Sequence, residues 1–172
     1  MCRVFIFLVL LSLLLLTSPA WANLDQRSTT PPPFGSALQA VPQPSIENVI
    51  DRAHELLGTP YKWGGATQEQ GFDCSGLLVY LFKTEANLLL PRTTRLMQRS
   101  GAATIKRGAL KPGDAVFFKG NGRGQVNHVG LYVGQGKFIH SPRTGKNTRI
   151  DSLSNNYWKK NFTFGKRFHA VR

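Results

Sequence analysis

One cysteine stands where a loop turns into an apolar helix, in the segment 71–76 (GFDCSG). The residues 77–82 (LLVYLF) that follow predict a helix buried on nearly every face. A thiol at a helix N-terminus lies near unpaired N–H groups and the positive end of the helix dipole, and both stabilise the thiolate. Because the thiolate is the nucleophilic form, Cys74 is a candidate nucleophile of a hydrolase. A buried, inert cysteine is the alternative.

Two of the four histidines lie in a predicted hairpin that could supply a base for this thiol. Strand alternation sets the face on which His128 and His140 lie. If Val133 pairs with Lys137 across a three-residue loop, His140 lies opposite Gly130 and the two imidazoles share a face. A loop one residue longer or shorter would put them on opposite faces.

With Cys74 as nucleophile, His128 as base and His140 as the group that orients the base, the chain offers a Cys-His-His triad. Two surface histidines are one alternative, and an open zinc site formed by the same three side chains is another. The sequence lacks closely spaced ligand pairs such as C-x-x-C, which disfavours a metal. His54, at the edge of an earlier helical stripe, is expected to be a surface or border histidine rather than a catalytic one.

The chain begins like an exported protein. Residues 1–22 combine a basic start, a short apolar run and an Ala-x-Ala ending, which predicts a signal peptide cleaved after Ala22. An uncleaved membrane anchor is the alternative, and after signal removal we expect no membrane span. Cleavage would leave Cys74 as the only thiol, so no internal disulfide could form. The Pro/Ser/Thr-rich segment 23–44 predicts an extended linker or disordered arm.

The balance of charge indicates an anionic partner. The 172 residues contain 22 Lys and Arg against 9 Asp and Glu, a formal net charge of +13. Export disfavours nucleic acid as that partner, so the acidic polymer of a cell envelope, or the envelope surface, fits better. A basic surface without a dedicated partner is the alternative.

Residues 45–172 predict one domain with a sizeable core. Helical patterns come first, and strand patterns follow from about residue 104. The expected helices are 46–57, 74–85 and 95–99, and the expected strands are 115–118, 128–133, 137–141 and 162–171. Helices followed by strands, without βαβ alternation, predict an α+β fold in which a central buried helix carries the cysteine and packs on an antiparallel sheet.

Six segments of this domain stand out together, and they are 58–65 (GTPYKWGG), 72–76 (FDCSG), 90–94 (LPRTT), 110–114 (LKPGD), 128–132 (HVGLY) and 138–141 (FIHS). In type and in order they resemble the NlpC/P60 family of cell-wall cysteine peptidases, which have a papain-like α+β fold. The resemblance covers about residues 45–172. It implies that Cys74 is the nucleophile, His128 the base and His140 the third catalytic group.

The resemblance also implies roles around the cleft. Tyr61 would lie beside the thiol with its hydroxyl near the oxyanion position. Asp73 and Ser75 match positions associated with substrate contacts, and Arg92 matches a residue of the cleft-side PRT segment. The alternatives are that Asp73 is only a helix N-cap and Arg92 only a solvated turn residue. Trp63 is expected to be a packing residue rather than a ligand contact.

For function, the resemblance implies an exported cysteine endopeptidase that needs no metal or organic cofactor. It would cut peptide bonds in peptidoglycan stem peptides or cross-links, of the D-Glu/diaminopimelate or D-Ala/diaminopimelate type. We expect a monomer that works in the periplasm, or is secreted or associated with the cell wall. Two other functions stay open: a wall-binding protein on the same fold with an inactive site, and an amidase or acyltransferase on a similar thiol fold.

Overall fold

The first helix of the domain, α1 (Ile46–Glu55), begins where the Ser45 side chain accepts a hydrogen bond from the backbone N–H of Asn48, at 3.1 Å. The computed structural model describes residues 45–120 and 124–169, so the expected signal peptide (1–22) and arm (23–44) lie outside the described residues. The described residues belong to one compact unit, which we treat by itself. None of their helices is long and apolar enough to span a membrane.

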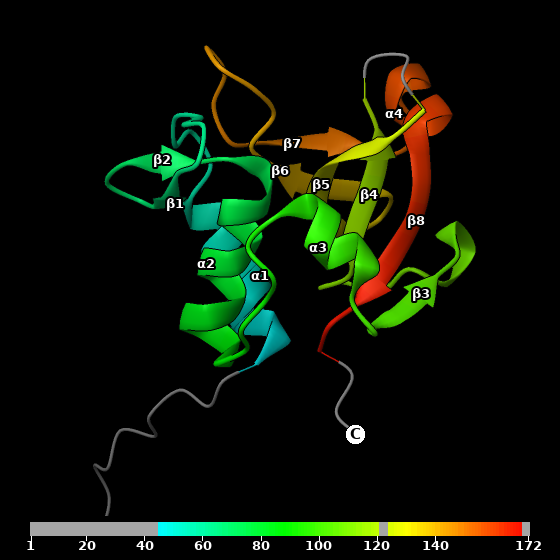
Figure 1. The fold of residues 1–172 in the computed structure, drawn as a ribbon, viewed down its shortest axis with the longest axis horizontal. Helices are drawn as coiled ribbons and strands as arrows, with labels where there is room; N and C mark the ends of the chain where they lie inside the picture. The colour runs from blue at the N-terminus through cyan, green and yellow to red at the C-terminus, as the bar shows by residue number, and fades with distance from the viewer. Residues whose placement is uncertain (1–44, 121–123, 170–172) are drawn as a thin grey trace, which may run out of the picture. The chain divides into compact units, whose positions relative to one another are not determined.

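Helix α2 (Cys74–Ala86) is the buried helix that the sequence predicts. It packs against α1 on one side and against the sheet on the other, as Figure 1 shows. Its N-cap is Asp73, whose side chain accepts from the Gly76 backbone N–H at 2.6 Å. A Cβ at Gly76 would collide with the carbonyl oxygen of Gly65. The backbone of Gly65 therefore lies directly against this glycine, and the loop before the helix packs on its first turn.

A six-stranded antiparallel sheet forms the second layer, with the strand order β3-β8-β4-β5-β6-β7. Its strands are β3 (Ala103–Ile105), β4 (Ala115–Lys119), β5 (Val126–Gly134), β6 (Lys137–His140), β7 (Arg149–Ser152) and β8 (Phe162–Arg167). The sequence predicted β4, β5, β6 and β8 but neither β3 nor β7. The observed architecture confirms the α+β prediction.

Shorter elements complete the domain. Helix α3 (Thr94–Arg99) follows the loop after α2 and is capped by Thr93, while the 3-10 turn η1 (Arg107–Ala109) precedes β4. Three further elements had not been predicted, and they are the two-stranded ribbon β1 (Ala66–Thr67) and β2 (Gly71–Phe72) and the helix α4 (Asn156–Asn161). The ribbon leads directly into the first turn of α2.

The turn between β5 and β6 differs from the prediction. Gly134, not Val133, pairs with Lys137. The loop is therefore the two residues Gln135 and Gly136, both with left-handed backbone, at φ values of 53° and 70°. Two positive φ angles in succession give the turn a twist that matches the twist of the flanking strands, which explains why the shorter loop forms.

A bulge compensates for the missing loop residue. The register shifts between Tyr132 and Gly134, so that Leu131 still pairs with Ile139 as the three-residue loop would have required. Along the body of the hairpin the pairing is thus the one expected, although the loop was wrong. The consequence is that His128 and His140 lie on the same face, as predicted.

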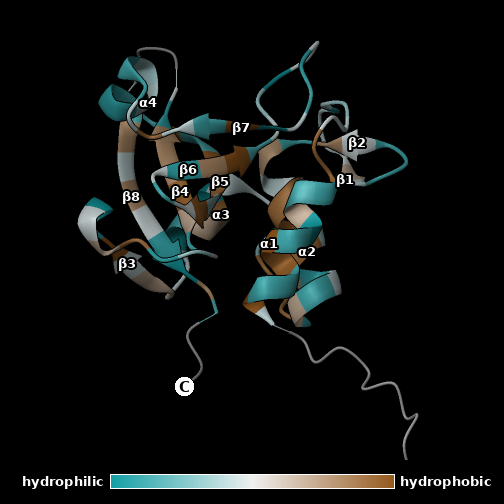
Figure 2. Cartoon of the chain, turned by 180° about the vertical axis from the view of Figure 1, so that it is seen from behind, coloured by the Kyte–Doolittle hydropathy of each residue, from teal (hydrophilic) through white to brown (hydrophobic). Residues whose placement is uncertain are grey.

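Both faces of the sheet are buried. Hydrophobic residues of α1, α2, β4 and β5 stand out in brown in Figure 2. On the helix side, inward residues of the central strands pack against α1 and α2, and they include Phe117, Val129, Leu131 and Ile139. On the other side a smaller cluster packs against Trp158 of α4, and it consists of Val116, Phe118, Phe138 and Leu153. The two predicted histidines lie on this second face, within an aromatic cluster.

Candidate active site

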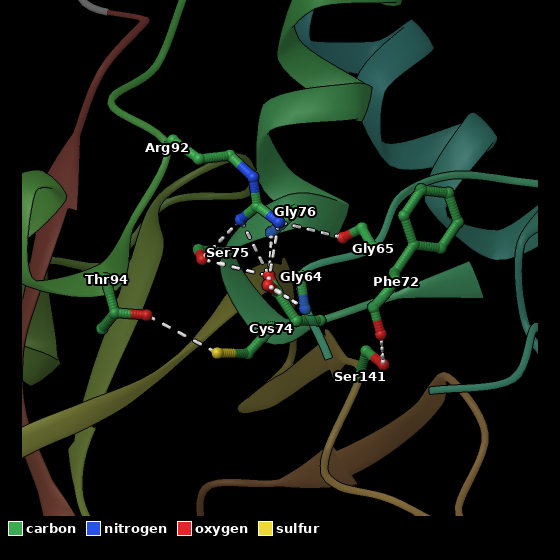
Figure 3. A network of polar contacts seen from close by, with 10 residues as sticks. Gly64, Gly65, Phe72, Cys74, Ser75, Gly76, Arg92, Thr94 and Ser141 are labelled. Atoms are coloured by element: carbon green, nitrogen blue, oxygen red, sulfur yellow. Dashed lines mark hydrogen bonds and ion pairs between the residues drawn. The ribbon is translucent and has the colours of Figure 1, made fainter. Parts of the chain in front are cut away.

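Cys74 is the first residue of α2, and its thiol points toward the neighbouring helix α3 (Figure 3). The Sγ atom lies 3.5 Å from the Oγ1 atom of Thr94, the first residue of α3. The backbone amide of Val129, the residue after His128 on β5, lies near enough to the sulfur to lower the pKa of the thiol. The side chain is half-buried and free of any disulfide. The thiol therefore lies where α2, α3 and β5 meet.

The resting thiol is protonated, contrary to the expectation from helix position alone. Burial raises the pKa of Cys74 above its ordinary value, and the charge of Asp73 raises it further. Hydrogen bonds from Thr94 and from the backbone amides of Val129 and Ser75 lower the pKa, but less. The helix start that was expected to favour a thiolate also carries the Asp73 carboxylate as its cap, and that charge opposes a second anion beside it.

The two histidines form a hydrogen-bonded pair. His128 Nε2 lies 2.8 Å from His140 Nδ1, with the ring planes nearly perpendicular at 79°. Burial lowers the pKa of His128 to about 3, and the neighbouring His140 contributes to the shift. Burial also lowers the pKa of His140. Both imidazoles are thus neutral at neutral pH, and His128 is able to accept a proton.

Cys74, His128 and His140 are positioned as a triad. Within the described residues, neither the thiol nor the Nδ1 atom of His128 hydrogen-bonds the other. Hydrogen bonds of catalytic groups are often long before substrate binds, so this spacing is compatible with proton transfer in the complex. The imidazole nitrogen still open for the thiol proton is Nδ1, because Nε2 is engaged by His140.

Asp151 extends the chain of contacts beyond the predicted residues. Its Oδ2 atom lies 3.0 Å from His140 Nε2, and the guanidinium of Arg149 and the indole N–H of Trp158 donate to the same oxygen. Burial alone would raise the pKa of Asp151, but its bonds to His140 and Arg149 outweigh burial and lower it to about 2. The carboxylate is therefore ionised at neutral pH.

Trp158, on α4, packs its ring against both histidines. Its ring stacks on His128, with centroids 5.6 Å apart and planes at 28°, and lies edge-on to His140. Neither Trp158 nor Asp151 was predicted from the sequence to lie near the histidines. The alternation of polar and apolar residues at 149–152 is a weak strand signal, and placing a strand there would have put Asp151 near the hairpin.

Asp73, Ser75 and Arg92 form one polar network beside the nucleophile (Figure 3). Arg92 donates to both carboxylate oxygens of Asp73, at 2.9 and 3.0 Å, to Ser75 Oγ at 3.2 Å and to the Gly65 carbonyl at 3.3 Å. Burial would raise the pKa of Asp73, yet the bonds from Arg92 and the Gly76 amide prevail and lower it. Arg92 is therefore not a solvated turn residue, and Asp73 is more than a helix cap.

Tyr61 lies in the loop that precedes β1, beside the start of α2. Burial raises the pKa of its phenol, and the nearby Cys74 and Asp73 raise it further, which places the ring within electrostatic reach of the nucleophile. Within residues 45–120 and 124–169 its hydroxyl makes no hydrogen bond. The phenol thus remains a donor without a partner in the protein.

Two other aromatic or imidazole side chains were assessed from the sequence. The expectation that Trp63 is a packing residue is wrong, since the residue is 85% exposed. The backbone on either side of Trp63 is pinned instead, because Lys62 donates to the Phe72 carbonyl and Gly65 to the Lys62 carbonyl. His54 is exposed on α1, as expected. Among the described residues, no three His, Cys, Asp or Glu side chains are grouped to hold a metal ion.

Comparison with known proteins agrees with this site. The model of the NlpC/P60 family matches residues 58–167. The murein DD-endopeptidase MepH of Escherichia coli K12 is 44% identical over 135 residues, which is 78% of this chain and 50% of MepH. The probable endopeptidase YafL of the same strain is 41% identical over 122 residues, 70% of this chain and 49% of YafL. The chain spans about half the length of these relatives.

Solved structures show the same fold. An NlpC/P60 family protein from Bacillus cereus ATCC 10987 superposes with a TM-score of 0.67 and 32% identity, covering 74% of this chain and 41% of the other. The NlpC/P60 domain of the peptidoglycan hydrolase SagA gives a TM-score of 0.62 and 27% identity, covering 72% of this chain and 98% of that domain. By sequence match and by structure, the chain belongs to the NlpC/P60 family.

Proposed function

We propose that this protein is a cysteine endopeptidase that hydrolyses peptide bonds of peptidoglycan. The observation that carries the proposal is a thiol at the start of α2, close to the backbone amide of Val129, next to a hydrogen-bonded pair of neutral histidines. A nucleophile, a base and a group that orients the base are the minimum set for acyl transfer through a covalent intermediate.

The protonation states define the first step. Since the free site holds a thiol and a neutral imidazole, His128 acts as a general base and takes the Cys74 proton on Nδ1 as the sulfur attacks the carbonyl carbon. The negative charge moves to the carbonyl oxygen. The backbone amide of Cys74 and the unpartnered hydroxyl of Tyr61 are the donors we propose for it.

The second half of the reaction returns the site to its starting state. The imidazolium of His128 gives its proton to the leaving amine, and the peptide bond breaks to leave a thioester on Cys74. A water molecule, deprotonated by the neutral His128, then attacks the thioester. The acid is released and the proton returns to the sulfur. No step requires a metal or an organic cofactor.

We propose that the network of Asp73, Ser75 and Arg92 contacts the substrate next to the scissile bond. Support comes from its position: it directly adjoins Cys74 in sequence and in space, and it holds an ionised carboxylate in place with a bidentate Arg92. An anchored carboxylate can receive the amine or amide groups of a stem peptide. The same network can orient either a D-Glu/diaminopimelate or a D-Ala/diaminopimelate bond, so the bond must be identified by experiment.

The setting of the reaction is also a proposal. The N-terminal residues 1–22 favour export, and we propose that the mature protein is a monomer that acts on the wall polymer in the periplasm. The formal net charge of +13 favours retention on an anionic polymer. N-terminal sequencing of protein recovered from the periplasmic fraction tests the export proposal, and a mature chain that retains residues 1–22 would contradict it.

Digestion of purified peptidoglycan tests the activity directly. Wild type, Cys74→Ala and His128→Gln are compared, with His54→Gln as the matched control because it removes an exposed imidazole from α1. We expect wild type and His54→Gln to release the same peptide fragments and the other two variants to release none. Mass spectrometry of the new termini names the bond that is cut.

The other outcomes separate the alternatives. If the wild type binds peptidoglycan but releases nothing, the chain is a wall-binding protein and the proposal fails. If the fragments are glycan chains freed from intact stem peptides, the enzyme is an amidase. Activity that survives Cys74→Ala would remove the thiol from the mechanism.

A further inference from the structure

The carboxylate of Asp151 ends a chain of hydrogen bonds that starts at the catalytic base. From β7 it meets His140 Nε2 at 3.0 Å, and His140 Nδ1 in turn meets His128 Nε2 at 2.8 Å. Strand pairing produces this geometry: His140 lies opposite Arg149, so Asp151 is its diagonal neighbour on the same face. His140 itself is fully buried, with no access to solvent.

The direction of each hydrogen bond in this chain follows from the ionised carboxylate. A carboxylate only accepts, so the proton of the Asp151–His140 bond must sit on His140 Nε2. A neutral His140 then has a bare Nδ1, which can only accept. The proton of the next bond must therefore sit on His128 Nε2, and a neutral His128 has its bare nitrogen at Nδ1. Nδ1 is the nitrogen that remains open for the thiol proton.

The negative charge of Asp151 affects the histidines less than its role as a hydrogen-bond acceptor does. Arg149 donates two hydrogen bonds to the same carboxylate oxygen, at 2.8 and 3.2 Å, and its positive charge opposes the effect of Asp151 on both histidines. The pair Asp151–Arg149 thus presents little net charge to the imidazoles. What it presents is a hydrogen-bond acceptor, held at a fixed place by Arg149 and by the indole of Trp158 at 2.9 Å.

We propose that Asp151 is a positioning residue that selects the proton-bearing nitrogen of both histidines, so that His128 keeps Nδ1 free as the base. It does not contact the substrate, and no proton moves along the chain during the reaction. The idea rests on the proposed peptidase function for its kinetic consequence, but the tautomers themselves are properties of the free protein.

The sharpest test measures the tautomers without any substrate. Protein labelled with ¹⁵N at histidine is studied at neutral pH by long-range ¹H–¹⁵N correlation, which distinguishes protonated from bare ring nitrogens. We expect both His128 and His140 to carry their proton on Nε2. A wild-type His128 that carries its proton on Nδ1 would overturn the proposal, whether or not the chain proves to be a peptidase.

Two substitutions separate an acceptor from a charge. Asp151→Ala removes the acceptor, so His140 and His128 should each become a mixture of tautomers. Asp151→Asn can keep an oxygen in place, since Arg149 and Trp158 both donate toward that position, and it should retain the wild-type tautomers. Asp51→Ala, which removes an exposed carboxylate from α1, is the matched control. Circular dichroism and unfolding by urea confirm that each variant is folded.

Kinetics on peptidoglycan fragments give the second readout. Asp151→Ala should lower kcat about 10- to 100-fold, with little change in KM. Loss of the hydrogen-bond partner that orients a metal-binding histidine commonly has an effect of this size, and the same physical role is proposed here. Asp151→Asn should stay within about 10-fold of wild type. If Asn is as damaging as Ala while the tautomers are unchanged, Asp151 acts through its charge and the proposal is refuted.

Discussion

The depressed pKa of His128 makes the stability of the fold depend on pH in a way that one substitution can isolate. In the unfolded chain this imidazole titrates near 6.5, whereas in the folded protein burial lowers its pKa to about 3. Below pH 6.5 the unfolded chain therefore binds a proton that the folded protein does not bind. By linkage, stability is unaffected above pH 6.5 and falls as the pH drops from 6.5 toward 3.

The magnitude follows from the two pKa values. One proton of difference changes the free energy of unfolding by about 1.4 kcal/mol per pH unit. At pH 4.5, two units below the unfolded value, the loss due to His128 is about 3 kcal/mol, and near pH 3 it reaches about 4 kcal/mol. These are large fractions of the total stability of a domain, which is typically about 5–15 kcal/mol.

Urea unfolding of wild type and His128→Gln at pH 7.5 and 4.5 measures this contribution. The wild type should lose about 3 kcal/mol more than the variant between the two pH values. All other ionisable groups are present in both proteins, so the comparison isolates the contribution of His128 to first order. His54→Gln should keep the wild-type slope. If the free energies of wild type and His128→Gln fall in parallel, His128 is not a buried neutral imidazole and the reasoning about the base is refuted.

Three further predictions concern the nucleophile and its surroundings. Because burial raises the pKa of Cys74, the rate of its alkylation by iodoacetamide should keep rising with pH above neutrality. Thr94→Val removes a hydrogen bond that lowers this pKa, so it should slow alkylation at any given pH. A rate plateau between pH 5 and 8 would contradict the neutral thiol. Gly76→Ala should destabilise the domain by about 1–3 kcal/mol in urea unfolding, since the added Cβ would meet the backbone carbonyl of Gly65. An unchanged urea midpoint would show that the loop carrying Gly65 moves to make room. Arg92→Lys should lower the free energy of unfolding by at least about 1.5 kcal/mol and reduce activity, because a lysine cannot make the bidentate contact with Asp73. Unchanged stability and rate would show that this bidentate contact is dispensable.

Much of the fold could be predicted because its central elements have unambiguous patterns. Helix α2 was found from its unbroken apolar run, and the long strands from their β-branched and aromatic residues. The hairpin shows both the strength and the limit of such reasoning. The face shared by His128 and His140 was predicted correctly, yet by a three-residue loop that does not exist. A bulge before Gly134 supplied the same offset, and bulges have no reliable signal in a single sequence.

The parts that were missed are short and polar. Strand β7 has four residues with only one apolar side chain, and α4 has no apolar stripe, so neither Asp151 nor Trp158 could be placed near the hairpin. Their positions come from strand pairing and packing between distant segments. The prediction for Trp63 was wrong for a different reason. An aromatic residue was expected to pack against others, but the backbone hydrogen bonds of its loop fix its position and leave the residue exposed to solvent.

The charge state of the nucleophile shows why local patterns do not determine chemistry. The helix start of α2 favours a thiolate, but burial and the cap Asp73 favour the thiol, and together they win. Burial also keeps His128 neutral. Both shifts oppose a resting ion pair, so proton transfer must accompany attack on the substrate rather than precede it. A thiolate generated from a thiol of high pKa is also the more nucleophilic one. The thiol of Cys74 therefore stays protonated until the carbonyl carbon of a substrate is in position for attack. Activation then depends on the Nδ1 atom of His128, which the hydrogen-bond chain through His140 to Asp151 leaves without a proton.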